Sequence, residues 1–107
     1  MITEQLQRCI RACGDCADEC RACADHCARM EMAEGEAICL ECADHCNQCL
    51  QTMRQGSNEQ CAHCAEMCDR CAGFCESWSN DDQMMRCAGV CRSCAEECRE
   101  TSIVKVG

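Results

Sequence analysis

Nineteen of the 107 residues are cysteines, and their spacing is the chemical feature that stands out in this chain. Between Cys9 and Cys27, six cysteines follow one another at intervals of 4, 3, 4, 3 and 4 residues. Residues three and four apart share one face of an α-helix, so this segment predicts a helix with a continuous stripe of thiols. Thiolates are the ligands that Cu(I), zinc and iron–sulfur clusters prefer. The stripe therefore indicates binding of soft metal ions inside a helical structure.

The stripe continues through the chain as a seven-residue repeat, Cys-x-x-Cys-Ala-x-x-Cys. An alanine beside the cysteines lets two helices approach closely, which brings facing thiols within reach of a shared ion. One further copy, at 84–91, has Met84 in place of the first cysteine. The complete copies lie at residues 13–20, 20–27, 39–46, 61–68, 68–75 and 91–98.

Turn residues divide the repeats into four helical segments. The periodicity predicts helices over about residues 3–32, 37–54, 59–77 and 81–100. We expect Thr3 to cap the first of these helices and the acidic residues at 81 and 82 to favour the start of the fourth. Gly35 is expected to end the first helix, and Gly56 the second, with Ser57 or Asn58 capping the third.

The composition favours an all-α fold. Proline is absent, and β-branched and aromatic residues are few, which disfavours a β-sheet. Short turns make neighbouring helices antiparallel, so we expect a single domain, residues 1–107, folded as an up-down-up-down four-helix bundle. The four stripes then face one axis and form a cysteine-lined core. Large apolar residues are scarce, so the metal-free bundle should be less stable than one packed with leucine.

Charge and cysteine chemistry exclude several classes of function. The net charge of −9 argues against nucleic acid and anionic membrane surfaces as partners. The first residues show neither a signal-peptide pattern nor a twin arginine, so we expect a cytosolic protein with reduced thiols. The alternative, a secreted mini-protein held by disulfides, has a loop-rich layout that does not space cysteines at helical period. We find no catalytic constellation in the sequence and do not expect an enzyme.

Cu(I) fits the arrangement of donors best. Structural zinc takes four ligands, usually from two cysteine pairs separated by a loop, whereas these donors run uninterrupted along helices. Cu(I) accepts two or three thiolates, and a bridging thiolate serves two ions, which gives roughly one copper per cysteine. Adding 19 thiolate charges to −9 gives −28, and nineteen Cu(I) ions would restore −9. The candidate ligands are Cys9, Cys13, Cys16, Cys20, Cys23, Cys27, Cys39, Cys42, Cys46, Cys49, Cys61, Cys64, Cys68, Cys71, Cys75, Cys87, Cys91, Cys94 and Cys98.

Other interpretations of the thiols stay open. Zinc or cadmium would also neutralise the thiolates, with about half as many ions, as in a metallothionein-like buffer. An iron–sulfur electron carrier is a weaker alternative, because the bacterial ferredoxin motif ends in proline and this chain has none. Cysteine as plain core material is a further possibility, although leucine would pack such a stripe far better.

The three histidines each precede a stripe cysteine and so lie on its flank: His26, His45 and His63. We expect most of these histidines to be solvated surface residues and not metal ligands. His26 differs because the end of the first helix and the starts of the second and fourth should meet at one mouth of the bundle. There, His26, Met30 and Met84 are candidate entry or auxiliary ligands, with Trp78 near the rim. Gap-filling is the alternative role of the methionines, and Met53 should lie at the opposite end.

The heptad Cys-x-x-Cys-Ala-x-x-Cys units on four short-linked helices resemble the cytosolic branch of the bacterial copper storage proteins. The resemblance spans Cys9 to Cys98. It implies a four-helix bundle, usually a homotetramer, that holds many Cu(I) ions on core thiolates, with all nineteen cysteines as ligands. A copper chaperone or an efflux protein is a candidate partner. Some cytosolic members carry a histidine-rich segment near one mouth, whereas the histidines here are scattered.

Overall fold

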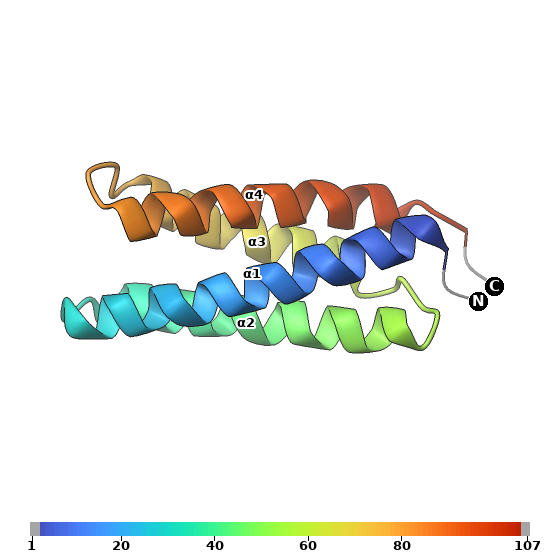
Figure 1. Cartoon of the computed structure of the whole chain (residues 1–107), viewed down its shortest axis with the longest axis horizontal. Helices are drawn as coiled ribbons and strands as arrows, with labels where there is room; N and C mark the ends of the chain where they lie inside the picture. The colour runs from blue at the N-terminus through green and yellow to red at the C-terminus, as the bar shows by residue number, and fades with distance from the viewer. Residues whose placement is uncertain (1–2, 106–107) are drawn as a thin grey trace.

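The computed structural model describes residues 3–105, so the ends of the predicted domain, Met1–Ile2 and Val106–Gly107, lie outside the described residues. Four helices make up the fold: α1 (Glu4–Arg29), α2 (Ala33–Arg54), α3 (Cys61–Glu76) and α4 (Asp82–Ser102) (Figure 1). The molecule is a rod of 45 × 19 × 17 Å.

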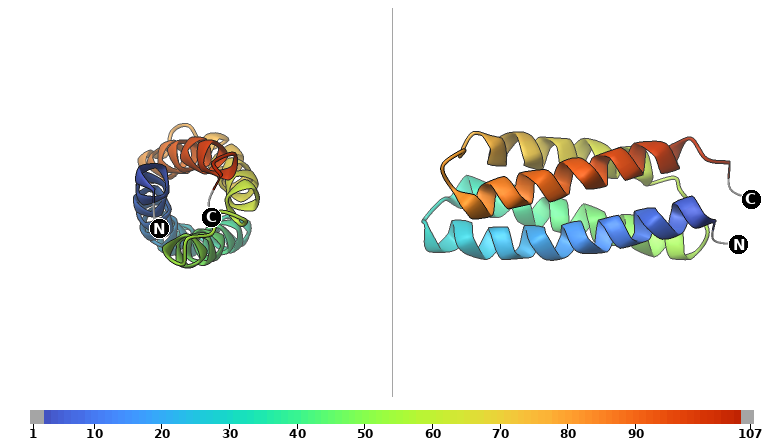
Figure 2. Two further views of the ribbon diagram at one scale, coloured as in Figure 1. Left: turned by 90° about the vertical axis from the view of Figure 1, so that its right-hand side faces the viewer. Right: turned by 45° about the horizontal axis from the view of Figure 1, so that its top comes forward.

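The four helices form a closed ring around one axis. α1 packs against α2 and α4, and α3 packs against the same two helices. The end-on view shows this ring, and the start of α1 and the end of α4 lie at the same end of the rod (Figure 2). We call that end the terminal end, and the end with the α1–α2 and α3–α4 turns the mouth. The predicted antiparallel all-α bundle is confirmed.

Two helix starts are fixed by side-chain caps, Thr3 as predicted and Asp81 at the start where acidic residues are expected to be favourable. The Thr3 hydroxyl accepts a hydrogen bond of 3.1 Å from the backbone N–H of Leu6. The Asp81 carboxylate accepts one of 3.1 Å from the N–H of Met84. Both bonds satisfy amide donors that the first turn of a helix leaves unpaired.

The prediction that Gly35 ends the first helix is wrong. The chain turns earlier, at Glu31, which adopts a left-handed conformation with φ of 58°. Gly35 lies inside α2, where an added Cβ would approach the Cys27 sulfur to 2.7 Å and the Phe74 ring to 3.0 Å. Glycine is therefore needed here for close packing. By contrast, Gly56, with φ of 88°, lies in the turn after α2 as predicted.

The turn between α2 and α3 does not contain the expected cap. The residue before α3 is Gln60, and its side chain makes no capping bond, so neither Ser57 nor Asn58 caps this helix. The Asn58 side chain instead donates hydrogen bonds to the carbonyl oxygens of Thr101 at 2.8 Å and Val104 at 2.7 Å. Asn58 thus fastens this turn to the end of α4, a tertiary contact that local capping rules do not contain.

The core consists almost entirely of sulfur and methyl groups. Every cysteine of the chain is at most 1 % exposed. The repeat alanines are buried beside them, as the motif predicts: Ala17, Ala24, Ala43, Ala65, Ala72, Ala88 and Ala95. Larger side chains close the terminal end, where Leu6, Met53 and Thr101 are fully buried. The stripes therefore line a tube that apolar residues cap at one end.

Charged residues cover the outside. On the α3–α4 face, Arg92 pairs with Glu76 at 2.7 Å and with Asp69 at 3.0 Å, and Arg99 pairs with Asp69 at 2.6 Å. Such exposed pairs contribute little to stability. None of the helices within residues 3–105 combines the length and apolar character that crossing a membrane requires.

Candidate metal centre

The thiols of the four helices meet in the core at van der Waals distances. Cys16 of α1 illustrates this, because its sulfur lies 3.7 Å from that of Cys91 on α4 and 3.9 Å from that of Cys68 on α3. A disulfide would hold two sulfurs at about 2.05 Å. All nineteen cysteines of the chain are free thiols, so the donors that the sequence predicts are brought together in their reduced form.

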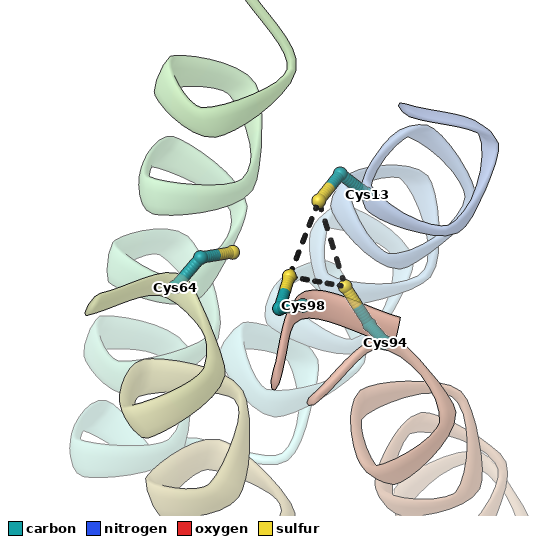
Figure 3. A group of neighbouring side chains, drawn as sticks. All are labelled: Cys13, Cys64, Cys94 and Cys98. Atoms are coloured by element: carbon teal, nitrogen blue, oxygen red, sulfur yellow. Dashed lines mark hydrogen bonds between the residues drawn. The ribbon is translucent and has the colours of Figure 1, made fainter. Parts of the chain in front are cut away.

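Sets of four sulfurs lie close enough to hold one metal ion. In the first set, the Cys13 sulfur lies 3.7 Å from those of Cys94 and Cys98, and Cys64 points toward them from α3 (Figure 3). Tetrahedral zinc, with bonds of about 2.3 Å, separates its sulfurs by roughly 3.8 Å, so the spacing suits metal coordination. The sulfurs of a set all lie within 4.8 Å of one another in Cys13/Cys64/Cys94/Cys98, Cys16/Cys20/Cys42/Cys91, Cys16/Cys42/Cys46/Cys68, Cys20/Cys71/Cys87/Cys91 and Cys23/Cys39/Cys75/Cys87.

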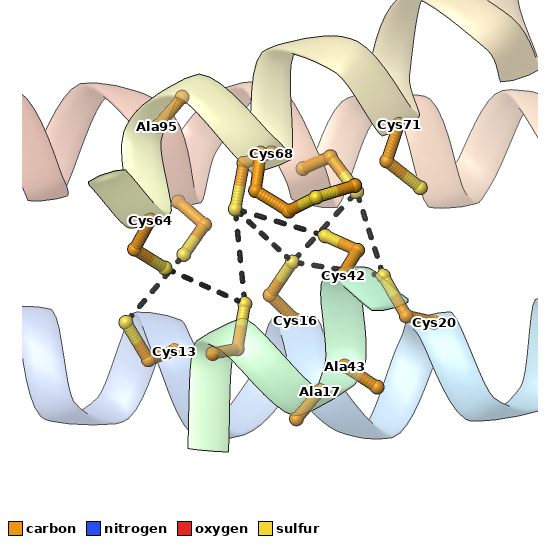
Figure 4. Packing of buried hydrophobic residues seen from close by; sticks show 14 of the residues in the cluster. Cys13, Cys16, Ala17, Cys20, Cys42, Ala43, Cys64, Cys68, Cys71 and Ala95 are labelled. Carbon is orange, nitrogen blue, oxygen red and sulfur yellow. Dashed lines mark hydrogen bonds between the residues drawn. The ribbon is translucent and has the colours of Figure 1, made fainter. Parts of the chain in front are cut away.

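Four of these five sets share members with one another, and the first set adjoins them where the Cys64 sulfur lies 3.8 Å from that of Cys46. Cys16 and Cys42 each belong to two sets, and so do Cys20, Cys87 and Cys91. The shared region is visible where Cys68 faces Cys16 and Cys42 (Figure 4). A thiolate in two sets can bridge two ions, so the sulfurs form a continuous line of sites along the bundle axis. The sequence predicts the stripes but does not say which thiols meet, since that depends on how the helices are aligned lengthwise.

Hydrogen bonds between thiols lower the pKa values of some cysteines in a set and raise those of others. In the set nearest the mouth, hydrogen bonds with Cys23 and Cys39 lower the pKa of Cys75 to about 5. The pKa of Cys39 is raised, chiefly because of its hydrogen bond with Cys23, and that of Cys87 chiefly because of its bond with Cys20. The pKa of Cys23 is also lowered, chiefly by its hydrogen bond with Cys39, so the set combines thiols that ionise readily with thiols that lose their protons only when a bound cation compensates the buried charge.

At the mouth, a thioether joins the thiols. The Met84 sulfur is fully buried and lies 3.5 Å from the Cys23 sulfur and 3.6 Å from the Cys27 sulfur. Burial, followed by the negative charge on Cys23, raises the pKa of Cys27 to about 12. Met84 thus occupies the position that its place in the repeat assigns to a cysteine, and it adds a neutral soft donor at the outermost layer.

His26 lies beside this layer and is held by α4. Its Nε2 atom lies 2.7 Å from a carboxylate oxygen of Asp81, and its side chain is 23 % exposed. The hydrogen bond with His26 lowers the pKa of Asp81, and the N–H of Met84 adds to this effect. Sequence reasoning did not find Asp81 as the partner of His26. The acidic N-cap position was the available signal, but the pairing of α1 with α4 was needed to use it.

The remaining residues predicted for the two ends take different positions. Met30 follows the last residue of α1 and is 56 % exposed, so it lies outside the buried stripe of cysteines. The helix ends at Arg29, because the chain turns at Glu31. Trp78 is exposed near the mouth, with its ring centroid 6.4 Å from that of Phe74. Met53 lies buried at the terminal end, as expected.

The terminal end also contains a polar seal that sequence reasoning missed. The Thr101 hydroxyl is fully buried, donates to the Glu97 carbonyl oxygen at 2.7 Å and accepts from the Gln5 side chain at 2.9 Å. The hydroxyl thus donates one hydrogen bond and accepts another, and its bond with Gln5 connects α4 with α1. Together with Leu6 and Met53, it separates the last thiols from solvent.

A family model described as copper storage protein matches residues 2–103. No curated protein sequence matches the chain significantly. Among solved structures, the Nmul_A1745 protein of Nitrosospira multiformis is 35% identical, with a TM-score of 0.84, and the match covers 95% of this chain and 98% of that one.

Two further structures carry the copper storage name. The metal-free copper storage protein 3 of Bacillus subtilis is 34% identical, with a TM-score of 0.81, and the match covers 88% of this chain and 95% of that one. A cytosolic copper storage protein of Streptomyces lividans, described with five coppers, is 27% identical, with a TM-score of 0.86 and 95% of each chain covered. The cysteine-lined bundle and the family match over nearly the whole chain agree, and this protein belongs to the copper storage protein family.

Proposed function

We propose that this protein stores Cu(I) ions on the thiolates of its core and so serves copper homeostasis and detoxification. The observation that carries this proposal is the overlap of the four-sulfur sets, in which five cysteines each belong to two sets. A continuous line of shared thiolates suits many bridged ions better than a few separate sites. Storage requires no chemical transformation of a substrate, so we propose no enzymatic activity.

We further propose that all nineteen cysteines are ligands and that the capacity is roughly one copper per cysteine. Support comes from their uniform burial and from the charge that one Cu(I) per thiolate neutralises. In a metal-free core, buried thiolates would repel one another, so copper must replace the thiol protons as it enters. Filling the core should therefore release protons in proportion to the copper bound.

The mouth is our proposed entry route. Met84 is a neutral sulfur donor beside Cys23 and Cys27, and a thioether binds Cu(I) less tightly than a thiolate does, which suits transfer inward. His26 lies close by and is oriented by Asp81. Met30 is the exposed donor of this group and would meet an ion first. Leu6, Met53 and Thr101 close the terminal end, which makes entry of an ion there less favourable.

The family membership is the basis for our proposals about location and partners. The Streptomyces lividans relative is described as cytosolic, and we propose the same compartment for this protein. Assembly as a homotetramer and exchange of copper with a chaperone or an efflux protein complete this proposal.

An anaerobic titration of the reduced protein with Cu(I), in competition with a chromogenic chelator, tests the proposal. Trp78 fluorescence reports binding near the mouth, and the chelator colour reports free copper. We expect the protein to bind close to one copper per cysteine before the chelator competes. Saturation after a few ions would contradict a high-capacity store. Preference for Zn(II) over Cu(I) in a direct competition would instead identify a metallothionein-like buffer.

A further inference from the structure

The two histidines that the core does not use lie together on the outer face of α2 and α3. The ring centroids of His45 and His63 are 6.2 Å apart, and the rings are tilted by 57°. Each histidine directly precedes a core cysteine, and the sulfurs of those cysteines, Cys46 and Cys64, lie 3.8 Å apart. The close contact between the thiols fixes the two backbones, so the separation of the imidazoles is set by the packed core.

The polar contacts of the two rings involve their Nδ1 atoms and leave Nε2 of each ring available. His45 donates from Nδ1 to the carbonyl oxygen of Glu41 at 3.0 Å, which leaves the lone pair on Nε2. The Nδ1 atom of His63 faces a carboxylate oxygen of Glu66 at 4.0 Å. Histidines that bind metals commonly use one nitrogen for the metal and donate the other N–H to a carbonyl or carboxylate oxygen. His45 has that arrangement, and the Glu66 carboxylate lies close enough to His63 to attract its Nδ1 side without a direct hydrogen bond.

The spacing and the charge of the surroundings suit a metal ion between the rings. With bonds of about 2.0–2.1 Å to nitrogen, two imidazoles on one ion place their ring centroids roughly 5 to 6.5 Å apart. The His63 side chain is 73 % exposed, so an ion has access from solvent. The exposed carboxylate of Glu66 adds negative charge beside His63. Imidazole and carboxylate together suit divalent ions of intermediate softness better than Cu(I).

We propose that His45 and His63 bind one divalent transition-metal ion of the Ni(II), Cu(II) and Zn(II) class on the surface of the bundle. This site is separate from the thiolate core, because the cysteines behind it are buried and point to the bundle axis. The Glu66 carboxylate, 4.0 Å from the His63 ring, lies beside the proposed site.

Equilibrium dialysis of the Cu(I)-loaded protein against Ni(II) tests this site. Loading first occupies the thiols, and Ni(II) is redox-inert toward them, so nickel is left to report other donors. We expect one Ni(II) per chain, with an affinity that falls at least about tenfold in His45→Gln and in His63→Gln. Asp18→Asn, which removes an exposed carboxylate on α1, is the control and should bind nickel as the unaltered protein does. Copper measured in the same samples shows whether the core is filled.

Proton NMR provides a second, independent readout. Ni(II) is paramagnetic, so substoichiometric nickel should broaden the ring signals of His45 and His63 and leave those of His26 sharp. Absence of nickel binding to the copper-filled protein would overturn the proposal. Binding that is unchanged in both glutamine variants would overturn it as well, because the surface carboxylates would then be the ligands.

Discussion

At the scale of single residues, this protein uses cysteine where other bundles use leucine. A thiol is a small, polarizable apolar group when protonated and a soft ligand when ionised. Burial keeps nineteen of them away from oxidants while leaving them close enough to share ions. The apolar surface buried by a core of cysteine and alanine is small, so the bound metal should provide much of the stability of the loaded protein.

Met84 allows one ligand to be tested without disturbing the packing. Met84→Leu removes the thioether from Cys23 and Cys27 but conserves volume, which usually changes stability by less than about 1.5 kcal/mol. We expect slower Cu(I) uptake in stopped-flow measurements and a total capacity lowered by at most about one ion. Met53→Leu, equally buried at the terminal end, is the matched control. Equal slowing in both variants would contradict entry past Met84.

At the scale of elements, helix ends and close helix contacts decide the detail of the mouth. Glu31 makes the turn between α1 and α2, and Gly35 lets α2 pack against α1 and α3. The N-cap Asp81 belongs to α4 but also binds the imidazole of His26 on α1. The mouth is therefore built from residues of α1, α2 and α4, and no single segment of the sequence specifies it.

Gly35→Ala should destabilise the protein although alanine favours helices. The new Cβ would lie 2.7 Å from the Cys27 sulfur, and overpacking of this kind typically costs about 1–3 kcal/mol. Gly73→Ala in α3 is the control, because its Cβ meets nothing within 4 Å and should stabilise by roughly 0.5–1 kcal/mol. Urea unfolding of both metal-free variants measures the difference. Similar changes in the two would mean that the contact at Gly35 relaxes without strain.

The pair of Asp81 and His26 should make stability depend on pH in the acid range. The hydrogen bond with His26 lowers the pKa of Asp81 below its usual 3.8. A carboxyl group with a lowered native pKa stabilises the fold above its usual pKa, and this contribution disappears as pH falls through the lowered value. Asp81→Asn keeps a capping side chain but removes the charge. At pH 7 the unaltered protein should unfold at a higher temperature than this variant. The difference in unfolding temperature should disappear as the pH falls below about 3.8.

A difference in unfolding temperature that stays constant down to strong acid would show that the charge of Asp81 is not its source. Asp82→Asn at the start of the same helix controls for the general attraction between carboxylates and the helix N-terminus.

At the scale of the whole molecule, the protein is a tube that is closed at the terminal end and has soft sulfur donors at the mouth. Leu6, Met53 and the hydrogen-bonded Thr101 close the terminal end. Asn58 fastens the α2–α3 turn across it through two hydrogen bonds to the end of α4. Between the two ends, shared thiols join four of the sets, and the close contact of Cys64 with Cys46 connects the remaining one.

A distributed store should lose capacity in steps. Replacing Cys42 and Cys46 with alanine removes two members of the set that includes Cys16 and Cys68. Because the other sets described above keep at least three of their four sulfurs, we expect the Cu(I) capacity to fall by roughly two ions, with most of the remaining capacity kept. Chelator competition and metal analysis measure the loss. Leu40→Ala, an exposed position of α2, is the control, and an all-or-none loss in the double variant would argue against many sites.

The sequence by itself determined the helices, their buried faces and the thiol-lined axis. These follow from spacing within each segment, since intervals of three and four residues place cysteines on one helical face whatever the partner helix is. The caps at Thr3 and Asp81 were predictable for the same reason, because a capping side chain reaches only its own first turn. The family resemblance depended on this local pattern as well.

Only the tertiary structure decided which residues from different helices meet. Cys13 lies beside Cys94 and Cys98, and His45 lies beside His63, because the helices are aligned lengthwise by turns and packing that periodicity leaves free. Gly35 shows the limit most clearly. Turn chemistry predicts a helix end at a glycine, but the contact with Cys27 required a residue without a Cβ, and Glu31 took the left-handed turn instead.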